Sequence, residues 1–327
     1  MKVITFGEVM LRLSPNGSLR FMQEPSFRAY FGGSEANTAA ALSQMGVDTS
    51  FVTKLPDNDI ARCCLKELSS LGVDTSDVSF GGKRIGIYYC ENGAGIRSGK
   101  VIYDRANSSI SEADLIDFNI DRILSAGDWF HFTGITPALS DSTAEITKAF
   151  ALGAHNKGIK VSCDLNYRSK LWSKEKANVI MTSLMPYVDI LMANEGSVFD
   201  VFGIEAKNDE ELSRILFKKF GFEAIALTKR KSENADVNTL SGILYRDGKA
   251  YCSPEMSVNI VDRVGGGDAF NAGIIYGIMN KLDCQKTVNI ANALNVFKHT
   301  VNGDLPIFDF DEIIAASAGV TDGRIRR

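Results

Sequence analysis

A basic surplus, a long apolar leader and paired cysteines are all lacking in this chain of 327 residues. Its 36 lysine and arginine residues face 40 acidic ones, which gives a formal charge of −4. That balance argues against nucleic acid or an anionic membrane as a partner. The apolar run within Met1–Gly7 is too short for a signal peptide or a membrane span, so we expect a cytoplasmic protein.

The six cysteines are spread over positions 63, 64, 90, 163, 252 and 284. None forms a Cys-x-x-Cys pair, and none clusters with the three histidines. The sequence therefore predicts neither a disulfide framework nor a zinc site, and it assigns no other metal site to protein side chains.

With 45% hydrophobic and 23% charged residues, the composition is that of a globular protein. No linker or repeat divides the chain, so we expect a single domain over residues 1–327. Strand and helix patterns alternate, which predicts a mainly parallel sheet with helices on both faces, a three-layer α/β/α fold with its site at the carboxyl ends of the strands. The expected strands are Val3–Phe6, Asp48–Leu55, Trp129–Thr133, Lys160–Leu165, Asp189–Ala193 and Glu223–Thr228, and the expected helices are Asn37–Gln44, Ile60–Leu71, Asp141–Asn156, Lys174–Met185, Asp209–Phe220, Ala269–Met279 and Thr287–Val301.

Two stretches, at about residues 11–31 and 86–105, break this alternation. Each has two β-rich runs around a turn, so we expect two antiparallel strand pairs. We interpret them as a small β-sheet that projects as a lid over the site. The alternative is an edge hairpin without a lid role. An exposed lid edge that pairs with a second copy would make the protein a homo-oligomer.

The most informative motif is Gly265-Gly266-Gly267-Asp268 at the start of an apolar helical pattern. Consecutive glycines leave peptide N–H groups open to a ligand, and a helix start favours an anion such as phosphate. Asp268 could accept a hydroxyl proton beside that anion, or could simply be the helix N-cap. Neither a Walker loop nor a dinucleotide fingerprint is present.

A second glycine pair, Gly32-Gly33, precedes Ser34 and an alanine-rich helix that includes Asn37. Together the two motifs resemble those of the ribokinase-like carbohydrate kinases of the phosphofructokinase-B type. In that family the first motif contributes to the sugar pocket and the second carries the anion hole and the catalytic base.

Within that family, the chain looks most like 2-keto-3-deoxygluconate kinases. Matching segments include Gly86-Ile87-Tyr88, Tyr103-Asp104-Arg105 and Asp164-Leu165-Asn166-Tyr167-Arg168. The resemblance implies a single ribokinase-like domain and a site for a sugar acid, whose carboxylate suits arginine. The implied sugar-binding residues are Gly33, Ser34, Asn37, Tyr88, Tyr103, Arg105, Arg168 and Asp304.

The same resemblance implies ATP and Mg²⁺ as cofactors. Asp268 would be the catalytic base, and Gly265, Gly266 and Gly267 would supply backbone donors. The family often has Asn-x-x-Glu where this chain has Asn194-Glu195-Gly196-Ser197. Adenine is expected near the helix Thr287–Val301, which carries Asn292, Asn295 and His299. The implied ATP-binding residues are Asn166, Asn194, Thr228, Lys229, Arg230, Gly265, Gly267 and Asn295.

The resulting expectation is transfer of the ATP γ-phosphoryl group to the 6-hydroxyl of 2-keto-3-deoxygluconate. One alternative is a fructokinase or another sugar kinase of the same family. Alternatives of other classes are a non-catalytic sugar-binding or regulatory protein and, more remotely, a nicotinamide dehydrogenase.

Overall fold

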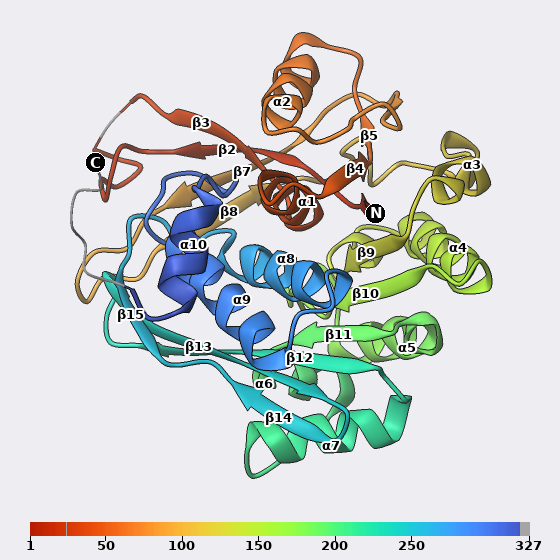
Figure 1. Ribbon diagram of the computed structural model, residues 1–327. Helices are drawn as coiled ribbons and strands as arrows, with labels where there is room; N and C mark the ends of the chain where they lie inside the picture. Colours follow the sequence, from red (N-terminus) through yellow and green to blue (C-terminus); the bar gives the residue numbers. More distant parts are fainter. Residues whose placement is uncertain (24, 321–327) are drawn as a thin grey trace.

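A nine-stranded sheet forms the middle layer of the computed structural model, which describes residues 1–23 and 25–320 (Figure 1). Six neighbouring strands, β4, β1, β9, β10, β11 and β12, are parallel, and β13, β14 and β15 are antiparallel to their neighbours. The mainly parallel sheet predicted from the sequence is confirmed. In spatial order the strands are β14 (Lys249–Cys252), β13 (Val237–Arg246), β12 (Ala224–Ser232), β11 (Ile190–Ala193), β10 (Lys160–Asp164), β9 (Trp129–Thr133), β1 (Lys2–Phe6) and β4 (Asp48–Val52), and β15 (Met256–Asn259) pairs with β13.

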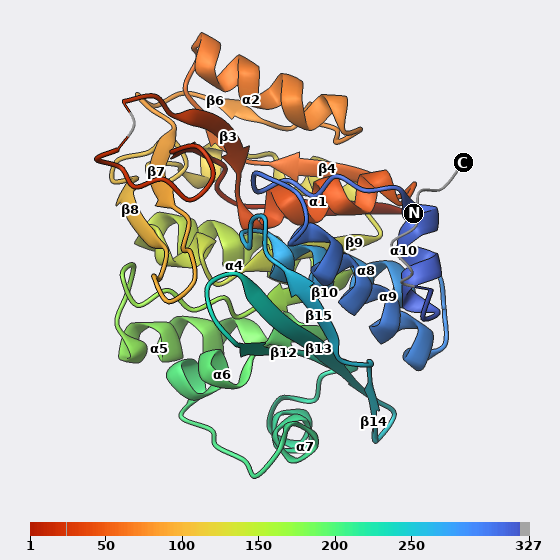
Figure 2. The same ribbon diagram turned by 90° about the vertical axis from the view of Figure 1, so that its left-hand side faces the viewer.

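Helices cover both faces of this sheet, so the predicted three-layer arrangement is also confirmed (Figures 1 and 2). One face packs against α3 (Ile120–Ser125), α4 (Asp141–Asn156), α5 (Lys174–Leu184), α6 (Glu195–Phe202) and α7 (Asp209–Phe220). The other packs against α1 (Ser34–Gln44), α8 (Gly266–Met279), α9 (Cys284–Lys298) and α10 (Phe310–Ser317). Helix α2 (Asp59–Ser70) shares a separate apolar cluster with α1. Three short 3₁₀ turns lie at Leu115–Asp117, Thr136–Ala138 and Met185–Tyr187.

A four-stranded second sheet is built from the two stretches that interrupt the alternation. Its strands, in spatial order, are β3 (Arg28–Gly32), β2 (Met10–Ser14), β7 (Gly86–Glu91) and β8 (Lys100–Asp104). The pairs β2–β3 and β7–β8 are antiparallel, as predicted, whereas β2 and β7 join them by a parallel pairing that neither stretch reveals alone. A two-stranded ladder of β5 (Lys54–Leu55) and β6 (Ser79–Phe80) lies apart from both sheets.

Three expected boundaries were wrong in ways that affect the site. Helix α1 begins at Ser34 rather than Asn37, and α8 begins at Gly266 rather than Ala269. The strand expected to end at Thr228 continues to Ser232 as β12, and Ser232 pairs with Asn238 across the β12–β13 hairpin. The end of β12 is exposed and its side chains are polar, so the sequence there lacks the apolar residues typical of a strand. Among the described residues, no helix is long and apolar enough to cross a membrane.

Candidate active site

A cleft of about 730 Å³ opens at the carboxyl ends of the parallel strands, between the main sheet and the small one. Its walls come from the starts of α1 and α8, from the segments after β10, β11 and β12, and from β7 and β8. Every site residue predicted from the sequence lines this one cleft. They are Gly33, Ser34, Asn37, Tyr88, Tyr103, Arg105, Asn166, Arg168, Asn194, Thr228, Lys229, Arg230, Gly265, Gly266, Gly267, Asp268, Asn295 and Asp304.

The start of α8 forms a glycine-lined wall of the cleft. Gly265 has a φ of +89°, and a Cβ there would lie 2.3 Å from the carbonyl oxygen of Asp304, so both conformation and space require glycine. A Cβ on Gly266 would lie 2.6 Å from Asn295 Oδ1, whereas one on Gly267 would meet no atom within 4 Å. The N–H groups of a first helical turn lack intrahelical partners and favour an anion. This turn therefore fits a phosphate group.

Asp268 lies within the first turn of α8, and the N-cap is Gly265, so the N-cap interpretation of Asp268 was wrong. Its carboxylate faces α1, where Ser34 Oγ donates to Oδ1 and Asn37 Nδ2 donates to Oδ2 at 2.7 Å. Burial raises the pKa of Asp268, while the hydrogen bonds from Ser34 and Asn37 oppose that shift. The result is an oriented carboxylate beside the glycine-lined turn.

The start of α1 packs closely against the segment after β1 and is hydrogen-bonded to the end of β9 and the turn that follows it. Gly33 is extended, and a Cβ there would lie 1.8 Å from the carbonyl oxygen of Glu8, so only glycine fits. The next contact is made by Glu35, whose Oε1 accepts from Thr133 N at 2.9 Å, Thr133 Oγ1 at 2.8 Å and Thr136 Oγ1 at 2.8 Å. Burial raises the pKa of Glu35 to about 7. Sequence reasoning missed Glu35, because no local pattern shows that it folds onto β9.

The residues predicted to meet a sugar acid lie around the small sheet. Arg105 is ion-paired with Glu8, a buried residue that also accepts from Ser108 Oγ at 2.9 Å, so this arginine is not free. Its buried Nε has no hydrogen-bond partner within the described chain, and its guanidinium carbon lies 5.3 Å from the ring centroid of Tyr103. A buried donor without a partner is unusual in a protein, and this one lies beside the cleft. Sequence reasoning did not foresee the role of Glu8.

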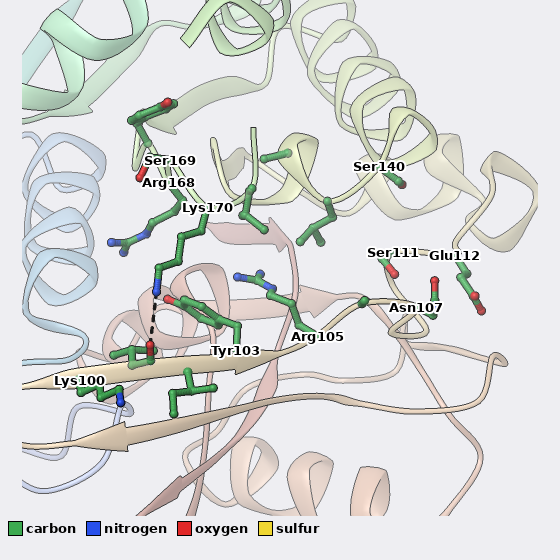
Figure 3. Close-up of a pocket in the computed structure, with 17 residues that line it drawn as sticks. Lys100, Tyr103, Arg105, Asn107, Ser111, Glu112, Ser140, Arg168, Ser169 and Lys170 are labelled. Atoms are coloured by element: carbon green, nitrogen blue, oxygen red, sulfur yellow. Dashed lines mark hydrogen bonds between the residues drawn. The ribbon is translucent and has the colours of Figure 1, made fainter. Parts of the chain in front are cut away.

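Arg168, in the segment after β10, approaches the same part of the cleft as Arg105, from the opposite side (Figure 3). Beyond Val101, Tyr103, Arg105 and Arg168 the cleft continues into an outer cavity of about 1050 Å³. Lys170 Nζ crosses toward β8 and donates to the carbonyl oxygen of Val101 at 3.4 Å (Figure 3). Two arginines from separate elements thus converge where the cleft meets the outer cavity.

Tyr88, on β7 of the small sheet, and Asp304 line the cleft side by side. The Tyr88 hydroxyl donates to Asp304 Oδ2, and Arg12 Nη1 donates to Asp304 Oδ1 at 2.9 Å. Both oxygens of Asp304 are therefore engaged inside the protein, and burial raises its pKa.

The residues predicted to meet ATP lie on the opposite wall. Asn194 caps α6, and its Oδ1 accepts from Ser197 N at 2.9 Å, so Ser197 completes a capping box with Asn194. Thr228 Oγ1 donates to the carbonyl oxygen of Ala193 at 3.5 Å, and Lys229 Nζ is 2.7 Å from Asp209 Oδ2. Burial, with a smaller contribution from the nearby Arg263, lowers the pKa of Arg230.

Helix α9 contributes Asn295 to the cleft and its C-cap residue His299 also lines it, with His299 Nδ1 2.7 Å from the carbonyl oxygen of Asn295. Asn292 is different, because its Nδ2 donates to the carbonyl oxygens of Leu240 and Pro254 in the protein interior. Asn292 is therefore a structural residue.

The end of β10 places another carboxyl group in the cleft. Asp164 accepts from Asn166 N at 3.0 Å and from Asn271 Nδ2 at 2.8 Å, and burial raises its pKa to about 6. Asn166 has a φ of +34° and donates from Nδ2 to Ser34 Oγ at 3.0 Å, so it contacts the residue that holds Asp268. The segment Asp164–Arg168 was singled out from the sequence, but the position of Asp164 near Asp268 was not foreseen.

Comparison with known proteins agrees with this geometry. Residues 1–304 match the family model described as pfkB family carbohydrate kinase. The chain belongs to that family. The predicted family, the ribokinase-like fold and the carbohydrate kinase activity are thereby confirmed, and the dehydrogenase and non-catalytic alternatives are set aside.

Several relatives match over nearly their whole length. The crystal structure of 2-dehydro-3-deoxygluconokinase from Thermotoga maritima is 44% identical, with a TM-score of 0.96 over 98% of each chain. A 2-dehydro-3-deoxygalactonokinase from Haloferax volcanii is 33% identical over 95% of both chains, and a 2-dehydro-3-deoxygluconokinase from Bacillus subtilis is 28% identical over 93% and 91%. An E. coli ribokinase II candidate, solved with ATP and Mg²⁺, has the same fold at 19% identity, with a TM-score of 0.83 over 95% and 97%.

Proposed function

We propose that this kinase transfers the γ-phosphoryl group of ATP to the 6-hydroxyl of 2-keto-3-deoxygluconate, giving the 6-phosphate. The observation that carries the chemistry is the carboxylate of Asp268, held by Ser34 and Asn37 beside the glycine-lined turn of α8. The names of the Thermotoga and Bacillus relatives support the sugar. The Haloferax relative makes the galactose-derived epimer the second candidate.

In the proposed reaction Asp268 accepts the proton of the 6-hydroxyl as the hydroxyl oxygen attacks the γ-phosphorus. The new O–P bond forms while the bond to the β-phosphate oxygen breaks, and ADP leaves. The N–H groups of the turn Gly265–Asp268 face the negative charge of the phosphoryl oxygens. The turn is closely packed from behind, because a Cβ on Gly265 or Gly266 would lie within 2.6 Å of Asp304 or Asn295.

Recognition of the sugar acid would come from the arginines at the far end of the cleft. A carboxylate matches the planar fork of arginine, and the Nε of Arg105 is buried without a partner among the described residues. Arg168 faces the same space from the other side. Tyr88 and Tyr103 from the small sheet would cover the sugar. The small sheet would then be the lid expected from the sequence.

ATP would lie along the opposite wall, with its phosphates toward α8 and its base near Asn295. Magnesium commonly keeps several waters and binds nucleotide phosphates together with one or two carboxylates. Asp164 and Glu195 are carboxylates on the cleft wall, so these residues fit a magnesium ion that arrives with ATP. Within the described part of the chain, no group of three acidic, His or Cys side chains forms a separate metal site. When bound, magnesium would neutralise phosphate charge.

An ATP-consumption assay with a panel of acceptors tests this function. The panel contains 2-keto-3-deoxygluconate, its galactose-derived epimer, fructose, ribose and adenosine. We expect the highest kcat/KM with 2-keto-3-deoxygluconate, with the epimer next and the neutral acceptors far lower. Turnover that is highest with a neutral acceptor would refute the sugar-acid assignment, and preference for the epimer would reassign the substrate to it.

A further inference from the structure

Four buried charges form a network behind the anion-binding turn of α8. Arg12 on β2 is fully buried, with Nη2 2.8 Å from Asp262 Oδ2 and Nη1 2.9 Å from Asp304 Oδ1. The fourth member is Lys298, at the end of α9, whose side chain approaches Gly265. One arginine cannot balance two ionised carboxylates, so with both Asp262 and Asp304 ionised the network is neutral when Lys298 carries its proton.

Lys298 is 1% exposed, an unusual environment for a lysine. Its Nζ donates to the carbonyl oxygen of Val301 at 3.4 Å, and no carboxylate of the described residues forms a direct ion pair with it. Burial lowers the pKa of Lys298, while Asp262 and Asp304 act in the opposite direction. Burying an ammonium group without an ion-pair partner destabilises a protein, so the buried Lys298 is a candidate for a functional role.

The network fixes the turn from two sides. Asp262 Oδ1 accepts from Val264 N at 3.2 Å, directly before the glycines, and its Oδ2 accepts from Gly303 N at 3.1 Å. A Cβ on Gly265 would lie 3.2 Å from Lys298 Cε and 2.3 Å from the carbonyl oxygen of Asp304. The side chain of Lys298 therefore packs directly behind the residue that caps α8.

We propose that Lys298 is a positioning residue for phosphoryl transfer, which holds the turn Val264–Gly267 and places a positive charge behind its N–H groups. It does not line the cleft, so it acts through the backbone rather than by touching the nucleotide. A preorganised charge in a water-excluded position stabilises the transition state more than the same charge in water. This inference rests on the proposed location of the γ-phosphoryl group, but not on which sugar is the acceptor.

Two variants separate this role from simple charge balance. Lys298→Met removes the ammonium and leaves Arg12 facing two carboxylates, whereas Lys298→Met with Asp262→Asn leaves one arginine and one carboxylate. We expect the single variant to lose thermal stability and the double variant to regain most of it. We expect kcat of both to fall roughly tenfold or more, since loss of one preorganised donor commonly costs 10²–10³-fold, with KM for ATP changed less than about threefold.

Lys286→Met is the matched control, because Lys286 is an exposed lysine on the same helix, and we expect it to keep both kcat and stability. Recovery of kcat together with stability in the double variant would overturn the positioning role. Failure of both variants to fold would do the same, since it would make Lys298 a folding residue. Turnover by Asp268→Asn would instead refute the proposed base, so the two failures are distinguishable.

Discussion

Asn37 donates a hydrogen bond from Nδ2 to Oδ2 of Asp268 at 2.7 Å, although the two residues are 231 positions apart in the chain. This bond joins the first turn of α1 to the first turn of α8, and Ser34 occupies the other carboxylate oxygen. Hydrogen bonds to a carboxylate favour its ionised form, which is the form that can accept a proton. The pair therefore links the two glycine-led motifs into the unit that we propose to be catalytic.

Replacing Asn37 with alanine should move the acidic limb of the pH profile of kcat to higher pH. Burial already raises the pKa of Asp268, and Asn37 opposes that shift, so losing the amide raises the pKa further. Because the base works only when deprotonated, activity then appears at a higher pH than in the wild type. Asn178→Ala is the control, since Asn178 donates to the carbonyl oxygen of Val201 away from the cleft. An unshifted limb in Asn37→Ala would contradict the assignment.

Asp268→Asn should lower kcat by roughly 10²–10⁴-fold, because the amide cannot accept the hydroxyl proton. The turn N–H groups are unchanged, so ATP binding measured by calorimetry should remain within about threefold of wild type. Asp209→Asn offers a comparison at a carboxylate that pairs with Lys229 at the edge of the cleft. A kcat for Asp268→Asn within a few fold of wild type would rule out the base.

The sequence carried enough local information for most elements and for the glycine turn. Helix α7 matches its predicted bounds, Asp209–Phe220, because Asn208 caps one end and Gly221, at φ +77°, ends the other. All predicted site residues reach one cleft, because parallel strands bring their carboxyl ends to the same edge of a sheet.

What sequence reasoning missed depends on contacts between distant segments. Glu35 folds onto Thr133 and Thr136, about 100 positions away, and Arg12 reaches Asp304 across 292 positions. Such pairings carry no periodicity or local motif. Strand β12 was predicted too short for a related reason, since its exposed end is stabilised by β13 and not by apolar burial.

Arg168→Ala should lower kcat/KM for the sugar acid by roughly 10- to 100-fold, because a charge-assisted hydrogen bond to the carboxylate is lost. Residual turnover of a neutral ketose should change little. Arg168 is a cleaner probe than Arg105, whose removal also leaves Glu8 without its ion-pair partner. Arg62→Ala, on the exposed surface of α2, serves as the control. Equal losses with acidic and neutral acceptors would argue against carboxylate recognition.

Gly267→Ala should impair catalysis without harming the fold. A Cβ there meets no atom within 4 Å in the protein, and alanine favours a helix over glycine by up to about 1 kcal/mol. The added methyl group would stand where the phosphate must approach, so kcat/KM for ATP should fall at least about tenfold. Gly273→Ala on the same helix should behave oppositely and lower the melting temperature, because its Cβ would lie 2.5 Å from Ala291 Cα. A kcat/KM for ATP that is unchanged in Gly267→Ala would show that the phosphate does not bind at this turn.

The contribution of Glu35 to the free energy of unfolding should decrease as the pH rises. Its pKa is about 7 in the folded protein against 4.5 for the ordinary side chain, so the folded state binds the extra proton between these values. The linked stabilisation is complete below pH 4.5 and is lost as the pH rises through 7, at up to about 1.4 kcal/mol per pH unit.

Glu35→Gln removes this titration while keeping an oxygen that can accept from Thr133 and Thr136. We therefore expect the free energy of unfolding of the variant to fall less than that of the wild type between about pH 5 and pH 7, as measured by urea titration at each pH. Other groups titrate alike in both proteins, so the difference isolates Glu35. Parallel pH dependences would show that Glu35 stays ionised in the folded protein, held by its three donors against the cost of burial.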